Sequence, residues 1–287
     1  MNATISLEAL AEKVQQLPTL PTVYIRVAER MNYPNSSAAD VGEIVAHDQA
    51  IAAKLLRVVN SSFYGFKHRI STVSRAITVI GFRGLRDLLL TLSALRVLRP
   101  WSDGKTFDDR LFWTHAAGCA ASARAAASLL RLEDPEEAFT AGLLHDVGKL
   151  AEYWFLRDDF LNVYWEAREK GAPLHDLEKE RLGFTHAEVG RLLAERWRLP
   201  PPLVEAIASH HAPGESEFKR DTAIVHLADI ISRALLLGGE TNERIPPLDM
   251  DAWEATGLAS EQIDPLMRAT EEEFRKGKEF LAIINDF

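Results

Sequence analysis

His145 and Asp146 are neighbours in the sequence and offer an imidazole nitrogen and a carboxylate, which together can bind one divalent cation. The carboxylate can also bridge to a second cation. Gly148 leaves room for a close approach, and Lys149 lies one helical turn after His145, where its ammonium can meet a phosphate. Because apolar residues crowd this stretch, we expect the His-Asp pair to lie in the core of a helical bundle.

The C-terminal half supplies further histidine and aspartate side chains, each on or beside an expected helix. Imidazoles and carboxylates suit iron, manganese, zinc or nickel, and they need no thiolate. A lone histidine in a helix is more often a hydrogen-bonded core residue than a ligand, but the joint pattern favours metal binding. Seven ligands with one bridging carboxylate predict a site for two divalent transition-metal ions. The predicted ligands are His115, His145, Asp146, His186, His210, His211 and Asp229.

Other candidate ligands are interpreted as structural. A second His-Asp pair, His47-Asp48, has no comparable partners nearby and fits a solvated face. His226 is expected to support the site or the core rather than bind metal, and His175 is expected in a loop. Cys119 is interpreted as a buried small residue, because the predicted ligand set is complete without it.

The composition narrows the classes of protein. The chain has 287 residues, of which 47% are hydrophobic and 26% charged, as in ordinary globular proteins. The net charge of −9, without long runs of Lys or Arg, argues against nucleic-acid and anionic-membrane surfaces. One cysteine excludes an internal disulfide. With no secretion signal and no long apolar run, we expect a cytoplasmic protein that does not enter membranes.

The elements that must position the ligands are all expected to be helices. Asp134 caps a helix that has Pro135 at its first position, and Thr185 with Glu188 forms a capping box just before His186. No strand pattern is evident. The expected helices span residues 7–16, 22–31, 40–46, 48–59, 73–80, 85–98, 107–130, 160–170, 177–181, 186–196, 203–209, 222–237 and 261–284. A further expected helix begins at Pro135 and carries His145 and Asp146.

The chain is expected to fold in two helical parts and a tail. Residues 1–100 form the N-terminal subdomain, residues 101–240 the subdomain with the metal site, and residues 241–287 a loop and helix. No Gly/Ser-rich linker separates the parts, so they are expected to fold as one unit. The last helix is expected to pack back on the bundle, with a partner or dimer face as the alternative.

Three motifs in the N-terminal part are long and specific. They are LPTLP at residues 17–21, LLRVVNSSFYG at 55–65, and the stretch from Ser71 to Arg86 that contains GFRGLR. Together they resemble the HDOD family, over roughly residues 10–235, with Asp48-Gln49 where the family commonly has Asp-Pro. The resemblance implies an all-α fold, an HDOD-type helical bundle in two parts with an HD-like C-terminal part. It also implies a role in bacterial signal transduction through protein partners.

The order of the histidines and aspartates resembles the binuclear site of HD-domain phosphohydrolases, especially the HD-GYP branch. Carried over, this resemblance implies one ion on His115, His145, Asp146 and Asp229, and another on Asp146, His186, His210 and His211. It also implies that Lys149 faces substrate phosphate. Many HDOD proteins have lost these ligands, whereas this chain keeps them. After the paired histidines, however, Ala212-Pro213-Gly214-Glu215 replaces the Gly-Tyr-Pro loop of that branch.

Two functions therefore remain open. The first is a signalling and regulatory module in which the metal site is structural or senses a ligand. The second is a metal-dependent phosphohydrolase or phosphodiesterase acting on a nucleotide or phosphoester. In the second reading Asp146 and Lys149 are the catalytic residues, one holding the ions and the other stabilising charge.

Overall fold

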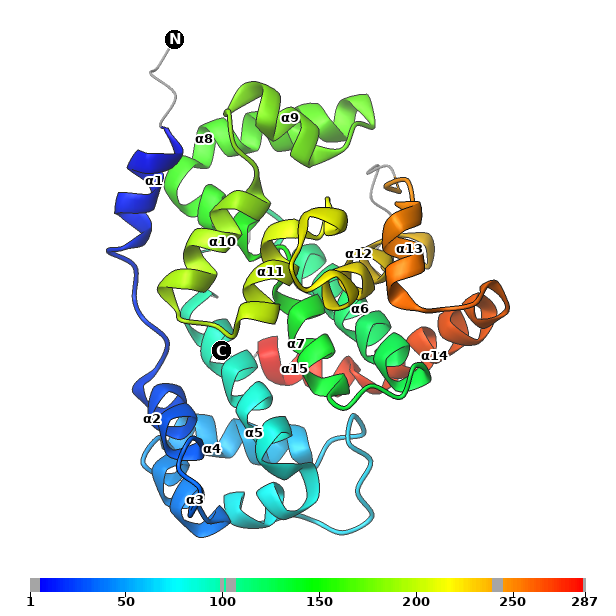
Figure 1. Cartoon of the computed structure of the whole chain (residues 1–287). Coiled ribbons are helices and arrows are strands. Elements are labelled where there is room, and N and C mark those ends of the chain that lie inside the picture. Colours follow the sequence, from blue (N-terminus) through cyan, green and yellow to red (C-terminus); the bar gives the residue numbers. More distant parts are fainter. Residues whose placement is uncertain (1–5, 99–100, 102–106, 239–244, 286–287) are drawn as a thin grey trace.

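The computed structural model describes residues 6–98, 101, 107–238 and 245–285, and these residues form helices without any strand (Figure 1). The prediction of an all-α fold is confirmed. None of the described helices is both long enough and apolar enough to cross a membrane. In chain order the α-helices are α1 (Leu7–Val14), α2 (Thr22–Met31), α3 (Ala38–Ala46), α4 (Gln49–Val59), α5 (Val73–Leu98), α6 (Asp109–Leu129), α7 (Pro135–Leu144), α8 (Val147–Lys170), α9 (Leu174–Arg181), α10 (His186–Arg196), α11 (Pro201–Ser209), α12 (Lys219–Ala234), α13 (Met250–Thr256), α14 (Ile263–Lys276) and α15 (Lys278–Asn285).

Capping side chains set several helix starts where the sequence predicted them. Ser6 accepts a hydrogen bond from the amide of Ala9 at the start of α1, and Asp134 caps α7, which has proline in its first turn. Thr185 and Glu188 form the predicted capping box of α10. Because that box fixes the first turn of α10, it also fixes the direction of His186.

Gly81 divides the long helix α5. Its φ of 76° and ψ of 172° lie outside the helical region, so two helical pieces meet there, as the sequence predicted. The second piece is buried along most of its length and packs against α7. It therefore lies between the N-terminal helices and the helices that surround His145.

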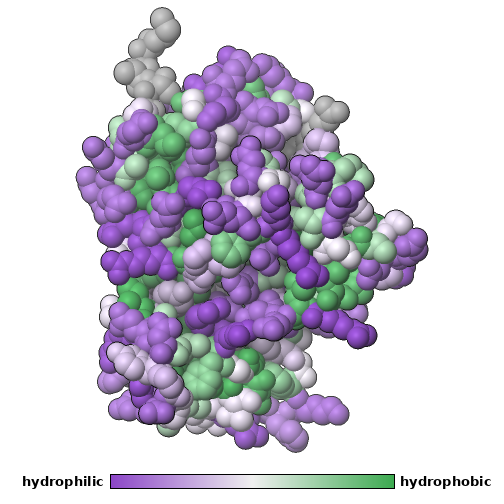
Figure 2. All heavy atoms as spheres, viewed as in Figure 1, coloured by the Kyte–Doolittle hydropathy of each residue, from purple (hydrophilic) through white to green (hydrophobic). Residues whose placement is uncertain are grey.

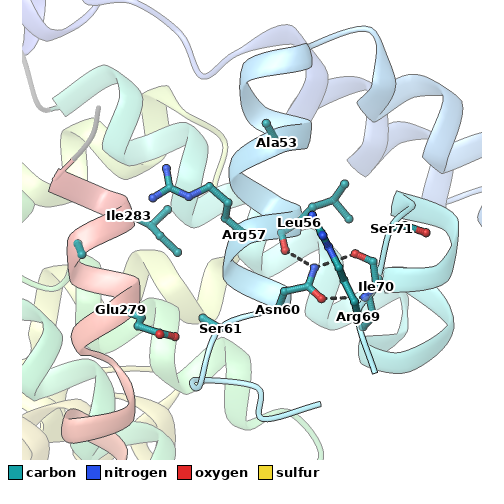
Figure 3. Close-up of a pocket in the computed structure, with 11 residues that line it drawn as sticks. Ala53, Leu56, Arg57, Asn60, Ser61, Arg69, Ile70, Ser71, Glu279 and Ile283 are labelled. Atoms are coloured by element: carbon teal, nitrogen blue, oxygen red, sulfur yellow. Dashed lines mark hydrogen bonds between the residues drawn. The ribbon is translucent and has the colours of Figure 1, made fainter. Parts of the chain in front are cut away.

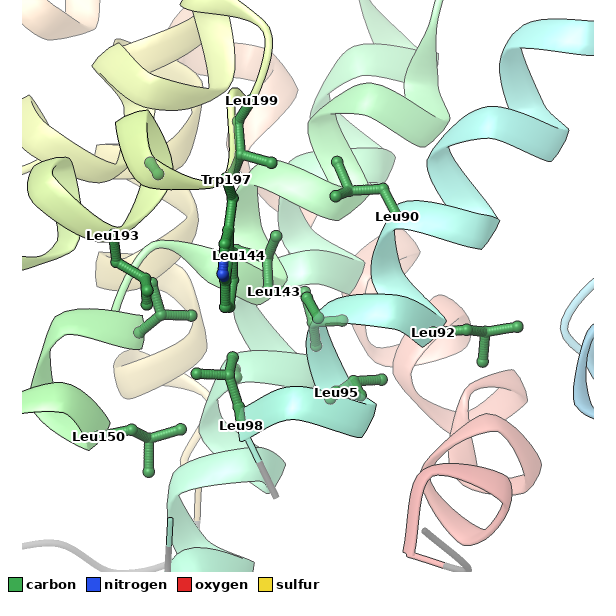
Figure 4. Close-up of a cluster of buried hydrophobic side chains, with 14 of the residues drawn as sticks. Leu90, Leu92, Leu95, Leu98, Leu143, Leu144, Leu150, Leu193, Trp197 and Leu199 are labelled. Atoms are coloured by element: carbon green, nitrogen blue, oxygen red, sulfur yellow. The ribbon is translucent and has the colours of Figure 1, made fainter. Parts of the chain in front are cut away.

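Helices α5, α7, α8 and α10 meet in a hydrophobic core (Figure 4). Leucines from α5, among them Leu95 and Leu98, face Leu144 at the end of α7 and Trp197 at the end of α10. All four side chains are less than a tenth exposed, and they belong to one contiguous hydrophobic cluster that reaches from α1 to α15. The N- and C-terminal helices thus share a core.

Two further connections join the ends of the chain to distant helices. The α1 helix lies against α10, and the Trp197 indole nitrogen donates to the carbonyl of Pro18 in the LPTLP motif. At the other end, Glu279 of α15 accepts hydrogen bonds from the amide and hydroxyl of Ser62, just beyond α4. A cavity of about 760 Å³ lies between α4, residues 69–71 and α15 (Figure 3).

The tail differs from the single helix predicted for residues 261–284. Residues 260–262 form a short 3-10 turn, and Gly277 separates α14 from α15. The helix α13 was not predicted. Leu266 and Phe280 are buried, so α14 and α15 pack back on the bundle (Figure 1). Figure 2 shows a mostly hydrophilic face, with apolar patches near α1 and near α14.

Candidate metal centre

His145 and Asp146 occupy the junction between two helices. The sequence placed them inside one helix, but α7 ends at Leu144 and α8 begins at Val147. Asp146 has φ −99° and ψ 10°, which turns the chain from one helix into the next, and its carboxylate does not cap α8. The turn leaves both side chains buried, at 0% and 1% exposure, and the carboxylate available for other contacts.

Two glycines let the surrounding backbones touch. A Cβ on Gly148 would overlap the carbonyl of His186 and come within 2.8 Å of the amide of Gly190, so α8 and α10 meet here backbone to backbone. A Cβ on Gly142 would lie 2.8 Å from the carbonyl oxygen of Cys119, where α7 crosses the alanine-rich helix α6. These contacts bring side chains from α6 and α10 to the His145-Asp146 junction.

The buried histidines and carboxylates form two adjacent groups of potential metal ligands. In each group one donor atom per residue lies within 4.8 Å of the others. All seven residues predicted from the sequence are present, and one residue was not predicted as a ligand, Cys119. The first group is His115, Cys119, His145 and Asp229; the second is Asp146, His186, His210 and His211.

Asp146 faces both groups. Its Oδ2 lies 3.3 Å from Nε2 of His145 and 3.9 Å from Nε2 of His115. Its Oδ1 lies 3.1 Å from Nε2 of His186 and 3.7 Å from Nε2 of His210. Each oxygen therefore points toward a different set of imidazoles, an arrangement suited to a carboxylate that bridges two cations.

The hydrogen bonds of two histidines leave one ring nitrogen free for a cation. Nδ1 of His145 is 2.7 Å from the carbonyl of Gly142, and Nδ1 of His210 is 2.8 Å from the carbonyl of Ile207. A carbonyl only accepts, so each Nδ1 bears the proton and Nε2 of the neutral ring has a lone pair. Both Nε2 atoms, like Oδ1 of Asp146, are buried without a hydrogen-bond partner in the described chain. These donors fit a metal ion.

The charges of several of these side chains suit cations, with one exception. Burial lowers the pKa of His210 to about 4 and that of His211 well below its usual value, so both rings are neutral near pH 7. Burial opposes the charge of Asp146, but the positive charge of Lys149, whose Nζ lies 2.6 Å from Oδ2, helps to hold the pKa of this carboxyl well below its usual range. Neutral imidazoles and ionised carboxylates are the protonation states in which these side chains bind metal. The exception is His186: burial lowers its pKa, but Glu178 outweighs burial and raises this pKa to about 8, so His186 must release a proton when a cation binds.

Glu178 supports His186, and a second buried glutamate, Glu152, lies close to Glu178; neither was predicted from the sequence. Glu178 is fully buried on α9, and its Oε2 accepts hydrogen bonds from Nδ1 and the amide of His186, at 2.6 and 2.9 Å. This bond directs Nε2 of His186 toward Asp146. Glu152 is also fully buried, and burial together with neighbouring Glu178 raises its pKa well above the usual value.

Two positively charged side chains, Lys149 and Arg233, lie beside the carboxylates of the site. Nζ of Lys149 is 2.6 Å from Oδ2 of Asp146, and Nε of Arg233 is 2.9 Å from Oδ1 of Asp229. Both side chains line a narrow cavity of about 50 Å³ that also reaches His115. Arg233 was not predicted, although it lies one helical turn after Asp229.

Two further histidines lie next to the second group. His175 belongs to α9, so its assignment to a loop was wrong, and its ring stacks on that of His211 with centroids 4.1 Å apart. Nδ1 of His226 donates to the carbonyl of His210 at 2.8 Å, and its Nε2 accepts from the amide of Asp249. Because both of its nitrogens are used by backbone groups, His226 is a supporting residue.

Comparison with known proteins places the chain. A model of the HDOD domain matches residues 17–213, well over half of its length. The chain belongs to the HDOD family. An uncharacterized protein of Treponema pallidum (strain Nichols) is 29% identical over 247 residues. The match covers 83% of this HDOD protein but 46% of the Treponema protein, so this chain spans about half the length of that relative.

Solved structures of similar fold include a member of the family from Geobacter sulfurreducens, an "HDOD domain protein with unknown function". It has a TM-score of 0.71 and 24% identity, covering 92% of this HDOD protein and 97% of the Geobacter chain. A "Putative phosphohydrolase" from Shewanella amazonensis SB2B has a TM-score of 0.71 and 25% identity, covering 96% and 97% of the two chains. The HDOD-type helical fold is thus shared over nearly the whole length.

Proposed function

We propose that this HDOD protein is a regulatory module of signal transduction that holds two divalent transition-metal ions in one buried centre. The observation that supports this best is the position of Asp146, whose two oxygens face two different sets of imidazoles. A single ion would serve only one of those sets and would leave the buried Nε2 of the other set, that of His145 or that of His210, without a partner. Two ions that share Asp146 satisfy both.

In this proposal, His115, His145 and Asp229 hold one ion, while His186, His210 and His211 hold the other. Iron, manganese, zinc and nickel all suit these donors. Glu178 holds His186 in the ring orientation and tautomer that a cation needs. The signalling role follows the family, and proteins are its expected partners, because a net charge of −9 disfavours nucleic acid.

A narrow approach to the centre favours regulation over turnover. The cavity beside Lys149 and Arg233 has a volume of about 50 Å³. Pockets that enclose small-molecule substrates usually have about 300–1,000 Å³. In addition, Lys149 and Arg233 are already paired with the carboxylates of Asp146 and Asp229. The sequence also lacks the Gly-Tyr-Pro loop of the HD-GYP branch.

A metal-dependent phosphohydrolase is the second candidate. The observation that favours it is that Lys149 and Arg233 line the same cavity as His115 and Asp146, where two positive charges could hold a phosphate. When bound, two divalent ions supply Lewis acidity toward phosphoryl oxygens. In this candidate Lys149 stabilises the charge that develops on the phosphate, and Asp146 holds the ions in place.

Elemental analysis and a hydrolysis screen test the two candidates together. The purified protein should contain roughly one to two transition-metal ions per chain, and two after reconstitution. Protein without metal, even after reconstitution, contradicts both candidates. The metal-loaded protein is then incubated with cyclic dinucleotides and generic phosphodiesters. Turnover that Asp146→Asn abolishes, and that Lys149→Ala lowers without loss of metal, identifies the enzyme; metal without turnover supports the regulatory module.

A further inference from the structure

Cys119 lies among the predicted ligands of the first ion. It follows His115 by one turn of α6, and its side chain is fully buried. Its Sγ is within 4.8 Å of the donor atoms of His115, His145 and Asp229. The close contact of Gly142 with the backbone of Cys119 holds α6 against α7, so the thiol and His145 are fixed side by side.

The spacing of the thiol matches that of a metal ligand. Zinc lies about 2.3 Å from sulfur and about 2.0–2.1 Å from nitrogen or oxygen, so in a tetrahedral site sulfur lies about 3.5 Å from the other donors. Sγ of Cys119 is 3.5 Å from Nε2 of His115 and 3.8 Å from Oδ1 of Asp229. A thiol is a weak hydrogen-bond donor, and hydrogen bonding alone gives little reason for this placement.

A second observation points to a cation at the same place. Nε2 of His145 is fully buried, faces the first group, and has no hydrogen-bond partner in the described chain. With Nδ1 committed to the carbonyl of Gly142, this nitrogen can only accept. The group thus contains an unpaired imidazole nitrogen, a second imidazole, a carboxylate and a thiol, all directed at one another.

We propose that Cys119 binds the first ion as a thiolate, together with His115, His145 and Asp229. This inference rests on the proposed metal centre and specifies its chemistry. On binding, the Sγ–H bond breaks, its proton leaves to solvent, and the sulfur lone pair forms the bond to the ion, without any redox change. The second group offers only nitrogen and oxygen donors. The two sites therefore differ in softness, and the first prefers zinc, iron or cobalt to manganese or magnesium.

Cobalt substitution tests the thiolate directly. Apoprotein prepared with a chelator is loaded with Co²⁺ in thiol-free buffer, and bound cobalt is counted by elemental analysis. Visible d–d absorption reports cobalt at either site, whereas a near-ultraviolet thiolate-to-cobalt charge-transfer band requires bound sulfur. Because the chain has one cysteine, such a band can come only from Cys119. The proposal expects both absorptions in the wild-type protein.

The outcomes separate this inference from the proposed function. Bound cobalt with d–d absorption but without the charge-transfer band overturns the thiolate and leaves the metal centre intact. No bound cobalt overturns both. These decisions need only the wild-type protein, so they hold even if a cysteine variant fails to fold.

Two variants then test metal preference. Cys119→Ser should lose the charge-transfer band. It should also bind Zn²⁺ at the first site at least about tenfold more weakly, because removal of a residue that only hydrogen-bonds to a metal ligand already weakens binding by about that factor. Its Mn²⁺ affinity should change much less. Ser122→Ala, at a fully buried position of the same helix, is the matched control and should keep the band and the Zn²⁺ affinity. Equal loss of Zn²⁺ and Mn²⁺ affinity in Cys119→Ser contradicts a thiolate-specific preference.

Discussion

The two His-Asp pairs of this chain both join two helices, and their surroundings are opposite. In each pair the histidine ends one helix and the aspartate begins the next: His47-Asp48 joins α3 to α4, and His145-Asp146 joins α7 to α8. Asp48 accepts a hydrogen bond from the amide of Ile51 and thereby caps its own helix, while His47 is exposed. Asp146 caps nothing and faces four imidazoles.

The difference shows that a His-Asp dipeptide at a helix junction does not by itself make a metal site. A carboxylate that caps a helix has used its charge on the first backbone amides. Asp146 keeps its oxygens for side chains because histidines of α6, α10 and α11 reach it. Among the described residues, α4 has no such neighbours. Glycine at position 148 makes the difference possible, since the equivalent position of the first pair is the exposed Ala50.

The largest effect on stability is expected from Gly148→Ala. This change places alanine two residues after Asp146, as Ala50 stands two residues after Asp48. The new Cβ would overlap the carbonyl of His186, so α8 and α10 must separate. We expect a loss of more than about 3 kcal/mol in the free energy of unfolding, measured by denaturant titration of the apoprotein. Gly214→Ala is the control, because its Cβ meets nothing within 4 Å. Equal stability of the two variants contradicts the close contact.

Asp146→Asn should remove metal-linked stability. The amide keeps the shape but not the bridging charge, so metal content should fall. The wild-type protein should gain about 2.7 kcal/mol when free metal exceeds the dissociation constant a hundredfold. The variant's melting temperature should not respond to metal or chelator. Asp48→Asn, the same change in the first pair, should keep the full response. An Asp146→Asn protein with wild-type metal content refutes the site.

Glu178→Ala removes the carboxylate of α9 that orients His186 toward the His145-Asp146 pair. Without the carboxylate, Nδ1 of His186 loses its 2.6 Å hydrogen bond and the ring is no longer held toward Asp146. We expect metal affinity to fall about 10–100-fold in competition with a chromogenic chelator. Glu180→Ala, on the exposed side of α9, should leave the affinity unchanged. Equal affinities for the two variants would mean that Glu178 does not orient His186.

The smallest effect is expected from Asp48→Ala. The loss of its cap on α4 should lower the free energy of unfolding by about 1 kcal/mol. Metal content should not change, because no imidazole nitrogen faces this carboxylate in the described structure. The measurement is a melt of metal-loaded protein alongside elemental analysis. A loss of metal here would contradict the contrast between the two pairs.

Local signals in the sequence were enough for most helices. The capping box at Thr185, the Asp134-Pro135 start and the left-handed Gly171 after α8 are each set by neighbouring residues, and each matched the structure. The break at Gly277 was missed because the apolar spacing of the tail continues through it. The start of α9 at Leu174 was missed although Pro173 directly precedes it.

The set of candidate ligands could be predicted because histidine and aspartate are recognisable residue types in helices. The roles of Glu178, Glu152 and Arg233 could not, since charged residues on a helix usually face solvent and only the packing of α8, α9 and α12 buries these three. Cys119 was judged unnecessary by counting ligands. The sequence places Cys119 one helical turn after His115, but it does not show that the thiol comes within 4.8 Å of the other donors of the first group.

The backbone contact at Gly148 has a consequence for the evolution of related chains. Substitution of this glycine is opposed by the carbonyl of His186 whether or not a metal is bound. The histidines have no comparable steric constraint once binding is no longer selected. In lineages that abandoned the metal we therefore expect the glycine to persist while the imidazoles drift, so a surviving His-Asp-x-Gly signature records shared architecture, and only the full set of donors from the other helices records metal chemistry.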